Sequence, residues 1–321
     1  MNRQLSIWKF IKESLEKNIP VMLLYVLEST GSSPGRQGFF MAVNANNEME
    51  GSIGGGIMEH KFVEMTKEKL ANVRGQLSDV RKQIHDKSAG KNQSGMICSG
   101  EQTILIYKVQ EKDIAPVEKI ISTLEQKKNA TLELSPEGIA FQDALPLMDY
   151  AFNLNNEDDW NYREKIGYKN HLYIIGGGHC ALAFSKLMST MDFYIHLFED
   201  REGLNTLEAN NYAHEKTIVE NYSELSELIP SGENSYVVVM TFGYRTDDIA
   251  VRALLDKHFK YFGLLGSKKK IEKMFEDYNK EGIHKEALQK IYSPIGIQIK
   301  SQTPDEIAVS IAAEIIKVKN A

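Results

Sequence analysis

Residues 171–183 read HLYIIGGGHCALA and join an apolar run, a glycine loop and the start of a helix. Gly176, Gly178 and Ala181 form the pattern G-x-G-x-x-A directly after the apolar run. In a dinucleotide-binding turn the first glycine permits a tight bend and the second lets a phosphate approach the backbone. The small third residue lets helix and strand pack closely. The stretch therefore predicts the first strand–loop–helix unit of a Rossmann-like domain.

Apolar runs alternate with helical stretches along the rest of this half. The runs are LYII, FYIHLF, TIV, YVVVM and YFGLL. Such alternation is typical of a parallel sheet with helices on both faces, so we expect an α/β, Rossmann-like domain over residues 169–321. The last helix starts at TPDE, where Thr303 is the expected cap, Pro304 takes the first helical position and Glu306 completes a capping box.

Ligands of open parallel sheets bind beyond the carboxyl ends of the strands. Glu199 and Asp200 follow the loop by about 20 residues, where an acid would meet a ribose hydroxyl. Arg201 beside them weakens the preference for an unphosphorylated ribose. The binding candidates of this half are Gly176, Gly178, His179, Asp200, Thr241, Gly266, Ser267 and Lys268.

Several of these side chains have structural explanations of equal weight. Thr241 and Asp247 can serve helix capping as well as a ligand. Cys180 begins a helix, where a thiol would be acidified, although the same place suits packing. Lys269 and Lys270 are expected on a solvated face.

The first half of the chain predicts an α+β domain over residues 1–152. Helical spacing at 5–17 is followed by strand-like runs, a second helix after residue 56, a strand near 101–109, a helix near 113–127 and a hairpin near 131–142. The segment NLNNEDDWNYREK, which starts at residue 153, is polar and acidic. Its composition favours a linker over residues 153–168.

A second glycine loop, GSIGGGIMEH, occupies residues 51–60. An N–H-rich loop at a helix start suits an anion. Glu59 follows in the first turn, where it would also compensate the helix dipole. Cys98 lies in SGMICSGEQ, and a lone cysteine is either a small buried hydrophobe or a reactive thiol.

Composition narrows the classes of function. The chain has 321 residues, of which 42% are hydrophobic, as is normal for a globular protein. Its net charge of −6 argues against a nucleic-acid-binding protein. Its two cysteines form no C-x-x-C pair, which argues against a structural zinc site and against a disulfide framework. The N-terminus lacks the apolar core of a signal peptide, and no apolar run is long enough for a bilayer. We therefore expect a cytoplasmic protein with no membrane or nucleic-acid partner.

These segments together resemble the XdhC/CoxI family, the accessory proteins of xanthine dehydrogenase and related molybdenum hydroxylases. The resemblance rests on their combination and order: TGSSPGRQG, GSIGGGIME, MICSGEQ, IIGGGHCALA, FEDR, YFGLLGSKKK and SPIGIQIKSQTPDEIAVSIAAEI. It covers nearly the whole chain and implies an N-terminal α+β domain followed by a Rossmann-like domain.

The resemblance implies a chaperone that binds the molybdenum cofactor, supports its sulfuration with a cysteine desulfurase and delivers it to an apo-hydroxylase. Cys98 would be a thiolate or persulfide near the molybdenum. A single ligand gripped by both glycine loops is then expected, as is a homodimer. By position, the cofactor-site candidates of the first half are Ser32, Ser33, Ser52, Gly54, Gly55, Gly56 and Glu59.

The sequence departs from the family pattern at two places. Cys98-Ser99-Gly100 stands where the family has Cys-Gly-Gly, and Thr241-Phe242 stands where it has Thr-His, so an imidazole is missing. Two other functions stay open. An NAD(P)-dependent oxidoreductase would turn nicotinamide over, whereas an NAD(H)-sensing regulatory protein would bind the nucleotide without turnover.

Overall fold

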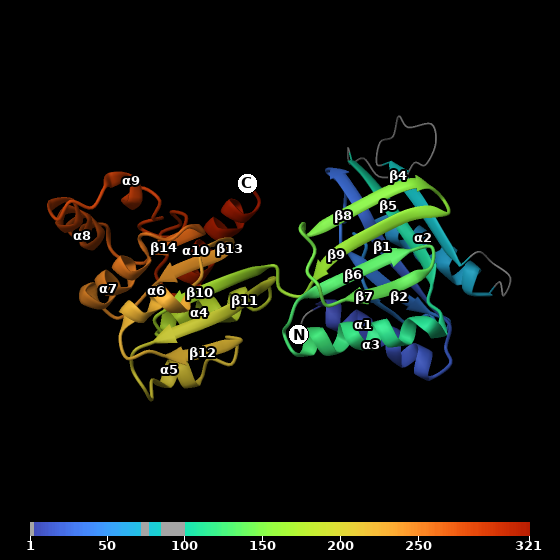
Figure 1. Ribbon diagram of the computed structural model, residues 1–321, viewed down its shortest axis with the longest axis horizontal. Coiled ribbons are helices and arrows are strands. Elements are labelled where there is room, and N and C mark those ends of the chain that lie inside the picture. The colour runs from blue at the N-terminus through green and yellow to red at the C-terminus, as the bar shows by residue number, and fades with distance from the viewer. Residues whose placement is uncertain (1–2, 72–76, 85–99) are drawn as a thin grey trace. The chain divides into compact units, whose positions relative to one another are not determined.

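The computed structural model describes residues 3–71, 77–84 and 100–321. The chain divides into two compact units, Met1–Gly167 and Tyr168–Ala321, and each is described by itself (Figure 1). Within the described residues, no helix has both the length and the apolar character needed to cross a bilayer.

The second unit is built on a parallel sheet in the order β12-β11-β10-β13-β14, and every neighbouring pair is parallel. This order, 3-2-1-4-5 in the chain's own sequence, is that of a dinucleotide-binding fold. The predicted α/β, Rossmann-like domain is confirmed. The strands are β10 (Asn170–Ile175), β11 (Phe193–Glu199), β12 (Glu215–Ile218), β13 (Gly232–Val239) and β14 (Phe259–Leu264).

Helices cover both faces of this sheet. Side chains alternate along each strand, so Leu172 and Ile174 pack toward α4 and α10, whereas Tyr173 and Ile175 pack toward α7 and α8. The burial of these two hydrophobic clusters holds the layers together. The helices and 3₁₀ turns are α4 (His179–Met188), α5 (Asn205–Glu208), η2 (Tyr222–Glu224), α6 (Leu225–Leu228), α7 (Tyr244–Leu254), α8 (Lys268–Lys280), α9 (Lys285–Leu288) and α10 (Pro304–Lys319).

Helix α10 starts as the sequence predicts. The Thr303 hydroxyl accepts a hydrogen bond from the Glu306 N–H at 3.2 Å, and the Glu306 carboxylate accepts one from the Thr303 N–H at 3.2 Å. The capping box satisfies backbone donors that a helix start otherwise leaves without partners.

The first unit contains two antiparallel sheets among its described residues. One has the order β3-β2-β1-β5-β4 and the other β7-β6-β9-β8. Together with the helices they confirm the predicted α+β region. The elements are α1 (Arg3–Glu16), β1 (Val21–Gly31), β2 (Phe40–Asn44), β3 (Met49–Gly51), α2 (Gly56–Ala71), β4 (Ser78–Ile84), β5 (Gly100–Lys108), η1 (Glu111–Asp113), α3 (Ile114–Glu125), β6 (Ala130–Ser135), β7 (Gly138–Gln142), β8 (Tyr150–Asn156) and β9 (Asp159–Ile166).

Strand β1 contributes to two cores. Met22 and Leu24 lie on the face that α2 covers, and Leu23 and Tyr25 lie on the face that packs against α1, α3 and the second sheet. Helices α1 and α3 lie side by side (Figure 1), joined by an ion pair between Lys12 and Glu118.

Strands occupy the segment whose composition favours a linker. Residues 153–166 belong largely to β8 and β9, and the units divide after Gly167. Most polar residues of this segment alternate with buried Trp160 and Tyr162 and face outward, and Glu164 is a buried exception. Buried and outward-facing residues alternate along β9, and this alternation indicates a half-buried strand. The polar composition of the segment as a whole does not reveal it.

A buried carboxylate joins the two sheets of the first unit. Glu164 of β9 is 1% exposed, and its Oε2 accepts hydrogen bonds from the hydroxyls of Tyr25 at 2.5 Å and Tyr162 at 2.8 Å. Burial, reinforced by the charge of Glu164, raises the pKa of both phenols well above the usual value of tyrosine. The phenols therefore stay protonated donors.

We expect Tyr25→Phe to lower the free energy of unfolding by about 1.5–3 kcal/mol, because it removes a hydrogen bond to a charged group. Tyrosines of the unfolded chain ionise near pH 10, whereas those of the folded chain resist ionisation. Stability should therefore be intact below about pH 10 and fall above it. Denaturant unfolding at several alkaline pH values measures both effects, and Tyr25→Phe should flatten the decline. An unchanged decline would contradict this explanation.

Candidate functional site

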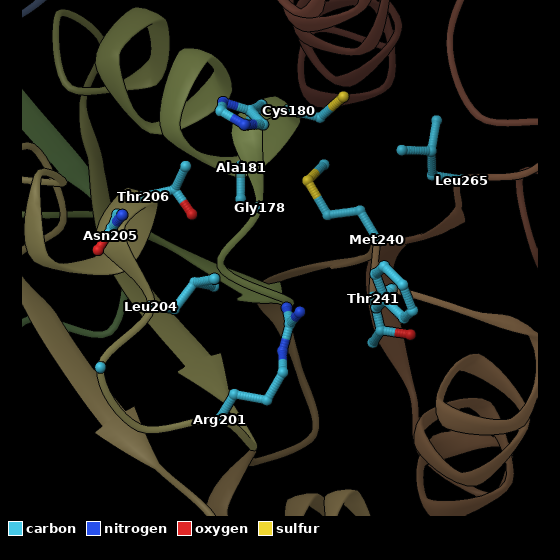
Figure 2. Close-up of a pocket in the computed structure, with 13 residues that line it drawn as sticks. Gly178, Cys180, Ala181, Arg201, Leu204, Asn205, Thr206, Met240, Thr241 and Leu265 are labelled. Atoms are coloured by element: carbon cyan, nitrogen blue, oxygen red, sulfur yellow. The ribbon is translucent and has the colours of Figure 1, made fainter.

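A pocket of about 700 Å³ lies beyond the carboxyl ends of β10, β11, β13 and β14 (Figure 2). Its position is the one that ligands take in open parallel sheets, and its volume is that of a small-molecule site. The lining residues are Gly178, His179, Cys180, Ala181, Arg201, Gly203, Leu204, Asn205, Thr206, Met240, Thr241, Phe242 and Leu265.

The glycine loop has the geometry that its sequence pattern predicts. Gly176 has a φ of +106°, and a Cβ there would lie 2.5 Å from the carbonyl oxygen of Met240. Gly178 caps α4 with extended backbone, and no described atom would lie within 4 Å of its Cβ. The first glycine therefore serves the bend, while the second leaves the backbone open to the pocket.

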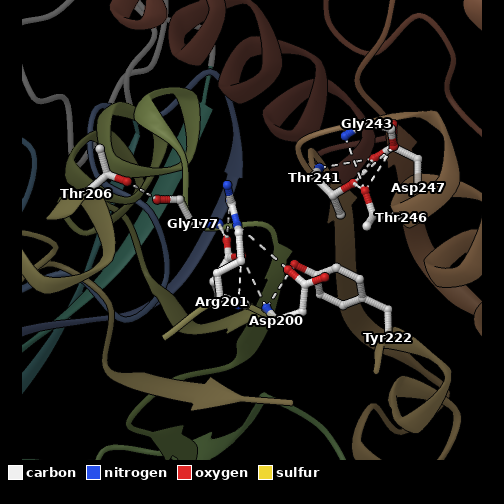
Figure 3. A network of polar contacts seen from close by, with 10 residues as sticks. Gly177, Asp200, Arg201, Thr206, Tyr222, Thr241, Gly243, Thr246 and Asp247 are labelled. Carbon is white, nitrogen blue, oxygen red and sulfur yellow. Dashed lines mark hydrogen bonds and ion pairs between the residues drawn. The ribbon is translucent and has the colours of Figure 1, made fainter. Parts of the chain in front are cut away.

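The acid at the end of β11 is committed to internal contacts. Glu199 is fully buried, and its carboxylate accepts hydrogen bonds from the Gly177 N–H at 2.5 Å and from Nε and Nη2 of Arg201 at 2.7 and 3.1 Å (Figure 3). Burial by itself would raise the pKa of Glu199, but the hydrogen bonds from Arg201 and Gly177 outweigh it and lower that pKa. Glu199 is therefore ionised, and its carboxylate oxygens are occupied by contacts within the chain instead of being available to the hydroxyls of a ribose.

Arg201 carries positive charge into the pocket. Its guanidinium lies within the space between Leu204 and Thr241 in Figure 2, and 5.4 Å from the centre of the Phe242 ring. The Phe242 side chain is 87% exposed. Arg201 and His179 are the basic members of the lining, which lies wholly in the described second unit and includes no carboxylate. The pocket therefore suits an anionic ligand with apolar surface.

Asp200 does not line the pocket. Its N–H donates to the Tyr222 hydroxyl at 3.3 Å, and burial together with the neighbouring Glu199 raises the pKa of its carboxyl group (Figure 3). Gly176 is likewise outside the lining.

Asp247 holds the end of β13 to two helices. It is fully buried and accepts hydrogen bonds from the Thr241 N–H at 3.1 Å and the Thr241 hydroxyl at 2.6 Å (Figure 3). It also pairs with the Lys270 ammonium. Thr241 reaches the pocket, but its hydroxyl also contacts Thr246. The expectation that Lys270 is simply solvated is wrong, because a buried carboxylate needs a cation beside it.

The other candidates after β14 lie away from the pocket. Ser267 caps α8 and accepts a hydrogen bond from the Lys270 N–H at 3.3 Å. The Lys268 side chain is 83% exposed, and its Nζ lies 3.8 Å from Oε1 of Glu272. Gly266 is also outside the lining, where Leu265 takes part instead.

Cys180 lines the pocket without the acidity expected at a helix start. Burial raises the pKa of its thiol above the usual value, so the thiol form prevails at neutral pH. Cys180 contributes a small, half-buried apolar surface to the pocket.

The glycine loop of the first unit also contains its own anion. Gly54, Gly55 and Gly56 have φ values of +128°, +76° and +70°. The Glu59 carboxylate accepts hydrogen bonds from the Ser52 hydroxyl at 2.6 Å and from the Ile53 and Gly55 N–H groups at 3.0 Å each. Glu59 thus acts on this loop as Glu199 acts on the other.

Three sequence motifs of the first unit converge at this loop. A Cβ at Gly35 would lie 2.0 Å from the Ile53 carbonyl oxygen, and one at Gly100 would lie 2.6 Å from the Ser33 nitrogen. The Gln102 side-chain amide donates to the Gly35 carbonyl at 2.9 Å. Backbone therefore packs directly on backbone, which explains the small residues.

The serine candidates of this region differ in burial. Ser33 is 7% exposed and its hydroxyl donates to the Gly35 carbonyl at 3.1 Å, whereas Ser32 is exposed. Cys98 lies outside the described residues. The expectation that one ligand meets both glycine loops stays a prediction.

Several lining residues escape sequence reasoning. Leu204, Met240, Phe242 and Leu265 supply the apolar wall, and the Thr206 hydroxyl donates to the Gly177 carbonyl at 2.6 Å. Met240 and Leu265 directly follow β13 and β14, so the end of each strand is the available signal. Among the residues described, no three His, Cys, Asp or Glu side chains are grouped so as to hold a metal ion.

Two family models match the chain. The model described as the XdhC Rossmann domain matches residues 172–315, and that of the XdhC and CoxI family matches residues 14–80. The chain belongs to the XdhC family. Together the two matches reach both units and confirm the resemblance drawn from the sequence.

Relatives and a solved structure agree with this assignment. The uncharacterized protein YqeB of Escherichia coli (strain K12) is 23% identical over 310 residues, which are 95% of this chain but 44% of YqeB. A probable xanthine dehydrogenase subunit of Bacillus subtilis (strain 168) is 34% identical over 82 residues, 26% of this chain and 23% of that protein. The chain thus spans less than half of either relative.

A crystal structure described as a xanthine dehydrogenase from Bacillus halodurans has the same fold. It superimposes with a TM-score of 0.69 at 20% sequence identity and covers 98% of this chain and 95% of its own.

The two glycines after β10 should respond differently to the same substitution. Gly176→Ala should lower the free energy of unfolding by about 3 kcal/mol or more, because the strain of the backbone and the clash with Met240 add together. Gly178→Ala should lower the free energy of unfolding by about 1 kcal/mol or less, because alanine is only a poorer helix cap than glycine. Thermal or denaturant unfolding of both variants measures this, and equal losses would refute the assigned roles.

Proposed function

We propose that this chain is a maturation factor for a xanthine dehydrogenase-type molybdenum hydroxylase and that it binds the molybdenum cofactor. Membership of the XdhC family, matched in both units, carries the proposal. Two similar proteins, the Bacillus subtilis relative and the solved Bacillus halodurans structure, are both described as xanthine dehydrogenases or parts of one. These descriptions support the same enzyme class as client.

The residues of the pocket fit this cofactor, a planar pterin that bears a phosphate. An apolar wall of Leu204, Met240, Phe242 and Leu265 suits a planar ring, and Arg201 suits the negative charge. The start of α4 beside Gly178 presents N–H groups to an oxyanion. When bound, the cofactor would supply the molybdenum centre that the client enzyme needs.

The cysteines have separate parts in this proposal. Cys98 would receive sulfur from a cysteine desulfurase and present it to the cofactor. It precedes Gly100 by two residues in the sequence, and Gly100 packs on the GSSP loop. Cys180 only packs, since burial keeps its thiol protonated. A homodimer that docks both the desulfurase and the apo-hydroxylase completes the proposal.

The state of Glu199 argues against ordinary NAD(H) binding. Its carboxylate, which would otherwise accept the ribose hydroxyls, is held by Gly177 and Arg201. The NAD(P)-dependent oxidoreductase and the NAD(H) sensor are therefore second to the cofactor chaperone, and one experiment separates them.

The decisive experiment is anaerobic binding of molybdenum cofactor and of NADH to the full chain. We expect the cofactor to bind with a dissociation constant of about 10 µM or lower, which is the affinity of a modest small-molecule site, and NADH to bind at least about tenfold more weakly. Cys98→Ala should bind cofactor but fail to promote its sulfuration by a cysteine desulfurase.

Cys180→Ala is the matched control, because it removes the chain's other cysteine and should leave sulfuration intact. Tight NADH binding without cofactor binding would overturn the chaperone proposal. NADH turnover would then favour the oxidoreductase, and binding without turnover the sensor.

A further inference from the structure

We propose that Arg201 recognises a terminal phosphomonoester, so that the pocket selects ligands in which a planar heterocycle carries this group. The inference deepens the proposed function, on which it rests for the pterin as ligand. The same chemistry occurs in two sources, the terminal phosphate of molybdopterin and the 2′-phosphate of NADP(H). The site itself follows from contacts around Glu199, Arg201 and Phe242.

The first step is the saturation of Glu199. Its carboxylate accepts from the Gly177 N–H, from Nε and Nη2 of Arg201, and from the backbone N–H groups of Asp200 and Arg201 at 3.2 Å each. A carboxylate offers about four lone-pair sites. Five donors leave none for the hydroxyls of an unphosphorylated ribose, which would need an acceptor here.

The second step is the direction of the guanidinium. Glu199 holds it through Nε and Nη2, and no partner of Nη1 is found in the described part of the chain. Figure 2 shows this group projecting into the pocket. Glu199 is thus a positioning residue, which fixes the plane of Arg201 so that its free N–H edge meets incoming oxygens.

The third step is charge. A phosphomonoester carries close to two negative charges and three acceptor oxygens, and it pairs with arginine through parallel hydrogen bonds. Glu199 already pairs with Arg201, and the lining itself, which lies wholly in the fully described unit, adds no further carboxylate that would oppose the phosphate. A ligand without the phosphate would instead offer the Arg201 N–H groups a neutral hydroxyl, which is a weaker acceptor than a charged phosphate oxygen.

The fourth step is the place of the heterocycle. Phe242 stands beside the guanidinium, 87% exposed, and the other wall of the pocket is apolar. A planar ring can pack on this surface while its phosphate reaches Arg201.

A second arginine of the same unit offers a matched control. Arg252 also binds a glutamate through two nitrogens, Glu281 at 2.6 and 3.1 Å, and lies 4.5 Å from the centre of the Tyr278 ring. It is absent from the pocket lining. Arg252→Met therefore repeats the change of Arg201→Met in a similar setting elsewhere.

The experiment measures binding to the full chain by ligand pairs that differ in one phosphomonoester. The pairs are NADPH with NADH, and metal-free molybdopterin with its dephosphorylated form. We expect the phosphorylated partner of at least one pair to bind about 10- to 100-fold more tightly to the wild type, the effect of hydrogen bonds to a charged group. Arg201→Met should abolish this preference, and Arg252→Met should retain it.

Arg201→Lys keeps the positive charge but lacks the planar guanidinium group. If Arg201→Met does not fold, the preference for the phosphorylated ligand can be measured with Arg201→Lys instead. It should retain only part of the preference. Discrimination by the pterin pair supports both proposals. Discrimination by the nucleotides, with no pterin bound, supports the phosphomonoester site and overturns the chaperone. Equal binding within both pairs, no binding at all, or equal losses in the Arg201 and Arg252 variants would overturn the inference.

Discussion

The candidate site depends on one buried carboxylate. Glu199 sits at the end of β11 with no exposure to solvent, and it is tolerated there because backbone N–H groups and the Arg201 guanidinium surround it. Removal of the Arg201 guanidinium would leave this buried charge with backbone donors alone, which is unfavourable. The same contacts bind the glycine loop to the next strand and aim Arg201. The position of the glycine loop and the direction of Arg201 therefore depend on the same carboxylate.

Much of the fold follows from local patterns. Apolar runs separated by helical spacing predict the parallel sheet, and TPDE predicts the start of α10, because both signals lie within a few residues. The composition after residue 153 favours a linker because the outward-facing residues there are polar. The alternation of Trp160 and Tyr162 shows that strands can hide in polar composition.

The candidate site is less accessible from sequence. Strand ends point to Gly178, His179 and Thr241, and these do line the pocket. Asp200 and Lys268 do not, because which neighbour of a strand end turns inward is decided by packing. Lys270 could not be paired with Asp247 from the sequence, since 23 residues separate them and only the docking of α8 on α7 brings them together.

Both glycine loops enclose a carboxylate of the chain, Glu59 in one and Glu199 in the other. The Ile53, Gly55 and Gly177 N–H groups are therefore satisfied before any ligand arrives, and an anion that takes one of them must displace an internal carboxylate. This competition would lower the affinity of any anion that binds through those N–H groups. In the carrier function that we propose, such competition would let a bound anion leave the loop again.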